Sequence, residues 1–183
     1  MTRSSTLAAT KLNDGLMMTR VAGILALGLS VLLEVLVVTP FCSSSQALLA
    51  PLLLAAVVQI GAGLNEWRHE RILESVVLVA FGLFTCAQIS QLGNLSTTPG
   101  NSLAQGAFLL FWGLFASRIA AQPSDCGRSF HLLLAAVAAT LLLKALVLVF
   151  ASPILWPFSL LAGVITFALA LLAALRHLPA LRS

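Results

Sequence analysis

Residues Phe130 to Ala151 read FHLLLAAVAATLLLKALVLVFA, and this stretch decides the fold. It is apolar over about 22 residues, whereas a helix rising 1.5 Å per residue needs about 20 to cross a hydrocarbon core of ~30 Å. A membrane β-strand is excluded because its side chains alternate between lipid and lumen, and this stretch is solidly apolar. It therefore predicts a membrane-spanning helix.

Five further apolar runs of similar length flank this stretch. They are Val21–Thr39, Ala47–Leu64, Ile72–Ile89, Leu103–Ala121 and Ile154–Leu175. Across the chain 60% of residues are hydrophobic and 9% charged, while soluble proteins are about one-quarter charged. The sequence predicts an all-α polytopic membrane protein, a bundle of six transmembrane helices. We expect a lead at 1–20, one membrane domain at 21–176, and a basic tail at 177–183.

The positive residues predict the orientation of the bundle. Nine of the ten basic residues fall before the first run, after the last, or in the loops on that same side of the membrane. The opposite loops, Pro40–Gln46, Ser90–Ser102 and Ser152–Pro153, contain no Lys or Arg. The positive-inside rule places both termini in the cytoplasm. The net charge of +4 is thus explained by topology and by contact with anionic lipid, and no nucleic-acid partner is implied.

Motifs of enzyme chemistry are not found. The chain shows no phosphate-binding glycine loop, no paired-cysteine motif and no nucleophile elbow. Glu66 and His69 have the spacing used in di-iron bundles, but such a site needs that pair twice, and no second copy exists. We therefore expect no enzymatic activity, no cofactor and no metal site.

Two formal charges, Glu34 and Lys144, lie well inside the apolar runs. Glu34 follows Arg20 by about 21 Å of helix and Lys144 follows Arg128 by about 24 Å, so both reach similar depths in the outer half of the membrane. Charges at such depths are expensive and usually pair or face water. Three interpretations stay open: an interhelical ion pair, a lining for an anion path, or two side chains that reach the outer interface separately.

Gln59 and Gln88 are the other polar candidates within the runs. Hydrogen bonding between helices is the simplest interpretation of each glutamine, because a polar group in lipid seeks a partner on a neighbouring helix. A position along a polar path is the alternative.

Three short motifs resemble the acetate uptake transporter family, which includes the succinate–acetate permeases. They are the segments QIGAGLNEW at Gln59–Trp67, AFGLF at Ala80–Phe84 and FWGLF at Phe111–Phe115. The N-terminal signature of that family is missing here, and Asn13 with Gly15-Leu16-Met17 only echoes it. Glu34 and Lys144 are additions relative to the family pattern.

The resemblance implies uptake of small monocarboxylate or dicarboxylate anions such as acetate or succinate. It also implies either a proton-coupled carrier or an anion channel, assembled as a hexameric ring in a bacterial inner membrane. Phe81 stands where many relatives have tyrosine, so the resemblance makes it the candidate for an aromatic constriction of the path.

Two functions follow as hypotheses. The first is a transporter or channel for small carboxylates whose path is lined by Lys144, Glu34, Gln59, Phe81 and Asn13. The second is a non-transporting accessory or assembly protein, in which Glu34 and Lys144 only tie helices together inside a sealed bundle.

Overall fold

Every element in the described part of the chain is helical. The structure is a computed structural model that describes residues 2–37, 45–94, 102–123, 127–152 and 154–176, with side chains described from residue 17 onward except at 45–46 and 92–94. The elements are α1 (Thr2–Val37), the short 3₁₀ helix η1 (Ser45–Leu48), α2 (Leu49–Arg68), α3 (Ile72–Asn94), α4 (Ser102–Ala120), α5 (Arg128–Phe150) and α6 (Trp156–Arg176).

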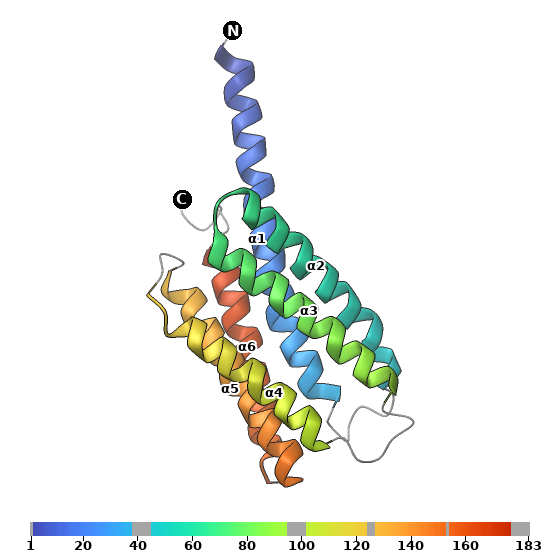
Figure 1. The fold of residues 1–183 in the computed structure, drawn as a ribbon. Helices are drawn as coiled ribbons and strands as arrows, with labels where there is room; N and C mark the ends of the chain where they lie inside the picture. The colour runs from blue at the N-terminus through green and yellow to red at the C-terminus, as the bar shows by residue number, and fades with distance from the viewer. Residues whose placement is uncertain (1, 38–44, 95–101, 124–126, 153, 177–183) are drawn as a thin grey trace.

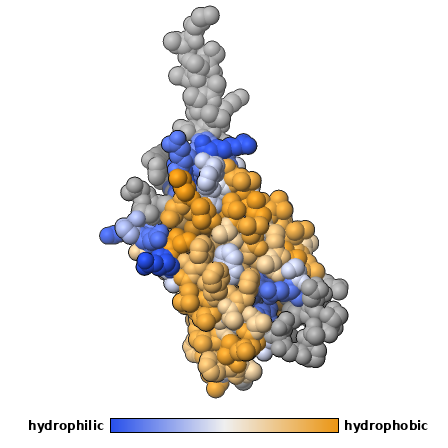
Figure 2. Space-filling view, in the orientation of Figure 1, coloured by the Kyte–Doolittle hydropathy of each residue, from blue (hydrophilic) through white to orange (hydrophobic). Residues whose placement is uncertain are grey.

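Six of these helices are long and apolar enough to cross a membrane, which confirms the predicted fold class. The helix bounds lie within a few residues of the predicted runs, since apolar length alone fixes where a span begins and ends. Side chains on the flank of the bundle are mostly hydrophobic, and hydrophilic ones gather toward its two ends, mainly the end where α1 projects (Figure 2). The chain is an integral, multi-pass membrane protein.

The predicted lead at 1–20 is continuous with the first span. α1 begins at Thr2, and the apolar part of the helix starts at Met17. Figure 1 shows the beginning of α1 projecting beyond the bundle. The predicted boundary at residue 20 therefore marks a change from polar to apolar sequence within one continuous helix.

Successive helices run in opposite directions (Figure 1). The beginnings of α1, α3 and α5 and the ends of α2, α4 and α6 therefore share one end of the bundle. Five pairs of helices pack extensively: α2 with α3, α4 with α5, α1 with α6, α1 with α2, and α5 with α6. α1 also contacts α3 and α5, less extensively. The backbones thus follow one another in the order α3, α2, α1, α6, α5, α4. The pair α3 and α4, at the two ends of this order, is absent from the closely packed set.

Small residues allow the backbones to approach closely. A Cβ atom added to Gly63 of α2 would lie 2.9 Å from the backbone nitrogen of Val79 and 3.0 Å from the carbonyl oxygen of Ser75, both in α3. Gly28 of α1 meets Ala170 of α6 in the same manner. Membrane helices cannot use a hydrophobic driving force against lipid, so such close packing supplies much of their association.

Two neighbouring glycines of α2 provide a matched test of this packing. Gly63→Ala is expected to lower the free energy of unfolding by about 1–3 kcal/mol, because overpacking against backbone atoms cannot be relieved by a rotamer change. Gly61 has nothing within 4 Å of an added Cβ, so Gly61→Ala should leave stability unchanged or raise it slightly. Denaturant unfolding of both variants in detergent checks the difference, and equal effects would contradict the packing described.

Candidate functional site

Glu34 and Lys144 meet inside the bundle. The Glu34 Oε2 and Lys144 Nζ atoms are 3.6 Å apart and join α1 to α5. Glu34 is 2% exposed and Lys144 4% exposed. The structure therefore shows the interhelical ion pair. Separate extension of the two side chains to the outer interface does not occur, because each is enclosed by the protein.

The ion pair is incompletely satisfied. A charge-assisted hydrogen bond between nitrogen and oxygen has a length of about 2.7–2.9 Å, and the Glu34–Lys144 separation is longer. Neither carboxylate oxygen of Glu34 makes a hydrogen bond with the described residues. Buried ions are stable only when geometry and extra hydrogen bonds offset their lost hydration. The carboxylate of Glu34 thus retains unused acceptor capacity.

Gln59 binds α2 to α1 one helical turn before Glu34. Its Nε2 group donates hydrogen bonds to the Ala26 carbonyl oxygen at 3.1 Å and to the Ser30 hydroxyl at 2.9 Å. Gln59 is fully buried, and Ser30 lies on the same face of α1 as Glu34 because the two are four residues apart. Gln59 therefore makes the interhelical hydrogen bonds expected of a glutamine in lipid, next to the ion pair.

A second polar contact lies one turn before Lys144. The hydroxyl oxygens of Thr140 in α5 and Thr166 in α6 are 2.9 Å apart, and both threonines are buried. Together with Ser30 and Gln59 they place hydrogen-bonding groups beside the ion pair on four helices. Sequence reasoning missed Ser30, Thr140 and Thr166. The available signal was spacing: Ser30 lies four residues before Glu34, and Thr140 lies four residues before Lys144. Thr166 has no charged residue at that spacing.

Gln88 of α3 is also buried, at 2% exposure. Its Nε2 group has no hydrogen-bond partner among the described residues. The sequence predicts the same role for Gln59 and Gln88, because each is a glutamine within an apolar run. In the structure, only the Gln59 amide donates hydrogen bonds that join two helices.

Phe81 lies in an aromatic cluster that fills the space between α3 and α4. Its ring centroid is 5.7 Å from that of Trp112, 6.0 Å from Phe84 and 6.4 Å from Phe115. Phe108 stacks on Phe84 at 5.6 Å. Phe81 is 1% exposed, so it faces the protein interior and not lipid.

Asn13, the remaining predicted path residue, falls in α1 before the apolar segment that starts at Met17. Its side chain lies outside those that the structure describes. The structure therefore brings Glu34 and Lys144 into contact, places Gln59 one turn away, and puts Phe81 in a separate aromatic cluster.

Ion pairs also tie the helices at the end of the bundle that holds the termini. Arg20 of α1 pairs with Glu74 of α3, and Arg71 pairs with Glu66 at 3.6 Å. Asn65 donates to the Thr19 hydroxyl at 2.8 Å. Both ion pairs join a positive to a negative side chain, and the Asn65–Thr19 hydrogen bond joins α2 to α1, so helix packing explains these contacts.

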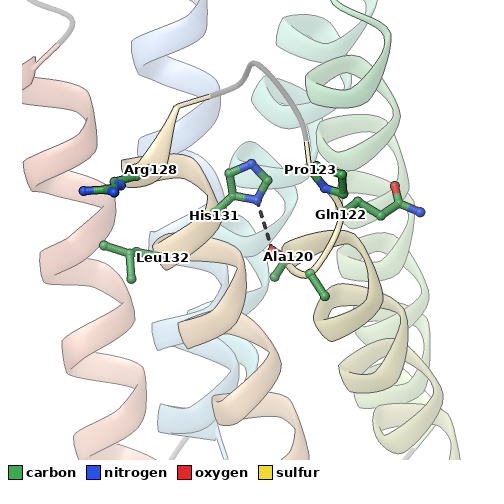
Figure 3. A pocket seen from close by; sticks show the side chains of 7 residues that line it. Ala120, Gln122, Pro123, Arg128, His131 and Leu132 are labelled. Carbon is green, nitrogen blue, oxygen red and sulfur yellow. Dashed lines mark hydrogen bonds between the residues drawn. The ribbon is translucent and has the colours of Figure 1, made fainter.

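A pocket of about 500 Å³ opens between α4 and α5 at the same end of the bundle. Residues at the start of α5 and at or just after the end of α4 line it, among them Arg128, His131, Ala120 and Pro123. Figure 3 shows the His131 ring directed at Ala120, while the Arg128 and Leu132 side chains extend to the other side of α5. His131 Nδ1 lies 3.1 Å from the Ala120 carbonyl oxygen and bridges the two helices. Lys144 follows Arg128 by about 24 Å of helix, so the pocket is separate from the ion pair. No cluster of three metal-binding side chains is found among the described residues.

The fold and the site together define a class: an integral membrane protein of six helices with an ion pair and neighbouring polar groups in its interior. A comparison with solved structures finds a match to the bacterial acetate channel SatP, with a TM-score of 0.76. Identity is 19%, and the match covers 86% of this chain and 89% of that chain. The match shows that the two proteins share a fold. Neither protein-family models nor curated proteins give a match to this chain.

The ion pair predicts a specific pattern of stability. Lys144→Met and Glu34→Gln should each lower the free energy of unfolding by about 3–5 kcal/mol, because each leaves one buried charge without its partner. The double variant should recover most of that loss, since no net charge then stays buried. Unfolding of the four proteins in detergent measures the coupling, and additive losses would contradict a direct interaction.

Proposed function

We propose that this protein is a membrane transporter or channel for small carboxylates, and a divergent member of the acetate uptake transporter family. The observation that carries the proposal is Lys144, an ammonium group buried in the interior of a bundle that shares the fold of an acetate channel. A cation at that depth lowers the energy of an anion in the membrane, because it substitutes for lost hydration. The three motifs that resemble the family agree with this assignment.

The interior polar groups support a path along the ion pair. Ser30, Gln59 and Thr140 lie within one turn of Glu34 or Lys144 on three helices, as the contacts above show. Buried polar and ionisable groups in membrane helices commonly mark routes for substrates or protons. Gln59 and Glu34 are therefore kept as path residues in the proposal, with Lys144 as the group that attracts the anion. Asn13 is proposed for the path by family resemblance alone.

Charge balance favours coupling to protons. If a substrate anion pairs with Lys144, the Glu34 carboxylate loses its counter-charge within a low-dielectric interior, which is strongly unfavourable. A proton on Glu34 removes this penalty, because the site then holds one ammonium, one anion and one neutral carboxylic acid. One proton would thus accompany each monovalent anion, and transport would be electroneutral.

The remaining features of the proposal concern assembly and location. The excess of Lys and Arg on one side supports cytoplasmic termini in a bacterial inner membrane. The resemblance supports a homo-oligomer, a hexamer in which each subunit has its own path. Surrounding lipid is the other partner, since large apolar side chains of all six spans are exposed on the isolated subunit.

A non-transporting accessory or assembly protein is the second candidate. One observation favours it: both members of the ion pair are almost completely enclosed. A structural tie between α1 and α5 would look the same in a static structure. The two candidates differ in what the loss of Lys144 does, and a transport measurement separates them.

Uptake of labelled acetate into proteoliposomes tests the proposal. The wild-type protein should accumulate acetate above empty liposomes, and an inward proton gradient should increase the rate. Lys144→Met should abolish uptake, and the Glu34→Gln/Lys144→Met double variant should stay inactive although its stability is largely restored. Absence of acetate and succinate uptake by well-folded wild-type protein would favour the accessory function instead.

The aromatic cluster gives a second functional prediction. Phe81→Ala removes a large ring from the interior between α3 and α4, and it should increase the rate of acetate uptake if this ring narrows the path. Phe111 on α4 is 65% exposed and contacts Trp112 from the outside, so Phe111→Ala serves as the matched control and should leave uptake unchanged. A decrease in uptake for Phe81→Ala in folded protein would contradict the role of Phe81 as a constriction.

A further inference from the structure

We propose that the beginning of α5 and the end of α6 form a binding site for one anionic phospholipid. In this site Arg128 and Arg176 bind the phosphate of the headgroup, and the acyl chains lie against the exposed apolar faces of the same two helices. The site is separate from the Glu34–Lys144 ion pair, and it does not depend on whether the protein transports a solute.

The charges of the bundle are divided unevenly between its two halves. α4, α5 and α6 contain no acidic residue. The acidic side chains that the structure describes belong to α1, α2, α3 or the turn between α2 and α3, and they are Glu34, Glu66, Glu70 and Glu74. Three of them form the ion pairs described above, with Lys144, Arg71 and Arg20.

The arginines of α4, α5 and α6 are consequently left without a carboxylate partner among the described residues. They are Arg118, Arg128 and Arg176. The connection between α4 and α5 contains one acid, Asp125, which lies outside the described residues, and the three arginines outnumber it. This half of the terminal end therefore carries a net positive charge that an anion from outside the chain can balance.

Arg176 and Arg128 come together at the first turn of α5. The Nη1 atom of Arg176 donates a hydrogen bond to the hydroxyl of Ser129, the residue that follows Arg128. The contact between Thr140 and Thr166 keeps the same antiparallel register of α5 and α6 to within one residue. Figure 3 shows the Arg128 side chain extending to the side of α5 on which α6 lies. Two like charges that repel each other are thus gathered at one place, and a shared phosphate would relieve that repulsion.

The start of α5 adds backbone donors to the two guanidinium groups. The helix begins after Gly127, which has no side chain that could cap it. The first N–H groups of a helix have no carbonyl partner within that helix, and the positive end of the helix dipole lies there as well. An anion at this position therefore meets N–H groups in addition to the charges of Arg128 and Arg176.

The surfaces that continue from the two arginines along the helices are apolar and exposed, which indicates a lipid and not a soluble phosphate. Residues at intervals of three or four share one face of a helix. The exposed residues at these intervals are Leu132, Ala135 and Ala139 on α5, and Leu172, Ala168 and Ile165 on α6. Arg128 and Arg176 are the first and last residues of their spans, so they lie at the membrane boundary, where lipid headgroups are found. A bound phospholipid would place its chains along these two faces.

The charge of the site selects the class of lipid. Two guanidinium groups attract a headgroup with a net negative charge, such as phosphatidylglycerol. Phosphatidylcholine also has a phosphate, but its quaternary ammonium group is repelled by the two cations. On the orientation proposed above, the site faces the cytoplasmic leaflet, where basic residues between membrane helices commonly bind anionic lipid.

Lipid binding to the purified protein in detergent tests the site. The Kd values for phosphatidylglycerol and for phosphatidylcholine with the same acyl chains are measured by native mass spectrometry. Wild type should bind phosphatidylglycerol roughly 30-fold more tightly, as expected for two basic residues at an anionic membrane surface. Arg128→Gln/Arg176→Gln should lose this preference and keep the affinity for phosphatidylcholine, because both side chains are exposed and the fold does not need them. Equal affinities of wild type for the two lipids would overturn the proposal.

Arg68→Gln/Arg118→Gln is the charge-matched control. It removes two exposed arginines from the same end of the bundle, one at the end of α2 and one near the end of α4. This variant should keep most of the preference for phosphatidylglycerol. An equal loss in the two double variants would show that general surface charge attracts the lipid, and it would overturn a site at Arg128 and Arg176.

Two further measurements identify the occupant of this surface. Glycerol phosphate, which has a phosphate but no acyl chains, should not displace phosphatidylglycerol; displacement would make this a site for soluble phosphates and overturn the assignment to a lipid. The same spectra report the number of subunits in each particle. A changed number in Arg128→Gln/Arg176→Gln, with the lipid preference retained, would make this surface a contact between copies of the chain and overturn the proposal.

Discussion

The ion pair between Glu34 and Lys144 constrains the whole bundle, because a charged side chain inside a membrane protein is stable only when it is paired or hydrated. Their contact requires α1 and α5 to approach at one depth. α6 packs on both of these helices, and its small residues allow this: Gly163 faces Val35, and Ala170 faces Gly28. The hydrogen bonds of Gln59 and Thr140 then fix α2 and α6 beside the pair.

Most of the fold could be predicted from the sequence because the relevant signal is simple. Apolar length is set by bilayer thickness, so each span could be located from composition to within a few residues. The ion pair was among the interpretations because depth along a helix follows from residue count. The continuity of α1 through residues 2–20 was not predicted, since the lead is polar and resembled a separate segment.

The orientation of each helix about its axis could not be predicted. In a soluble helix the apolar face identifies the core, but here every face of a span is apolar. The interior position of Phe81 and the different bonding of Gln59 and Gln88 therefore required the structure. Ser30, Thr140 and Thr166 were missed for the same reason, because a hydroxyl in an apolar run carries no sign of the helix it faces.

α3 and α4, the first and last helices in the packing order, contact each other through side chains. Five interfaces in that order are formed by backbones in close approach, whereas α3 and α4 are joined by the rings of Phe81, Phe84, Phe108, Trp112 and Phe115. A seam made of side chains can change width by substitution of a single ring, with no helix displaced. Point mutations at this seam can therefore alter the packing between α3 and α4, while the remaining five interfaces keep the fold.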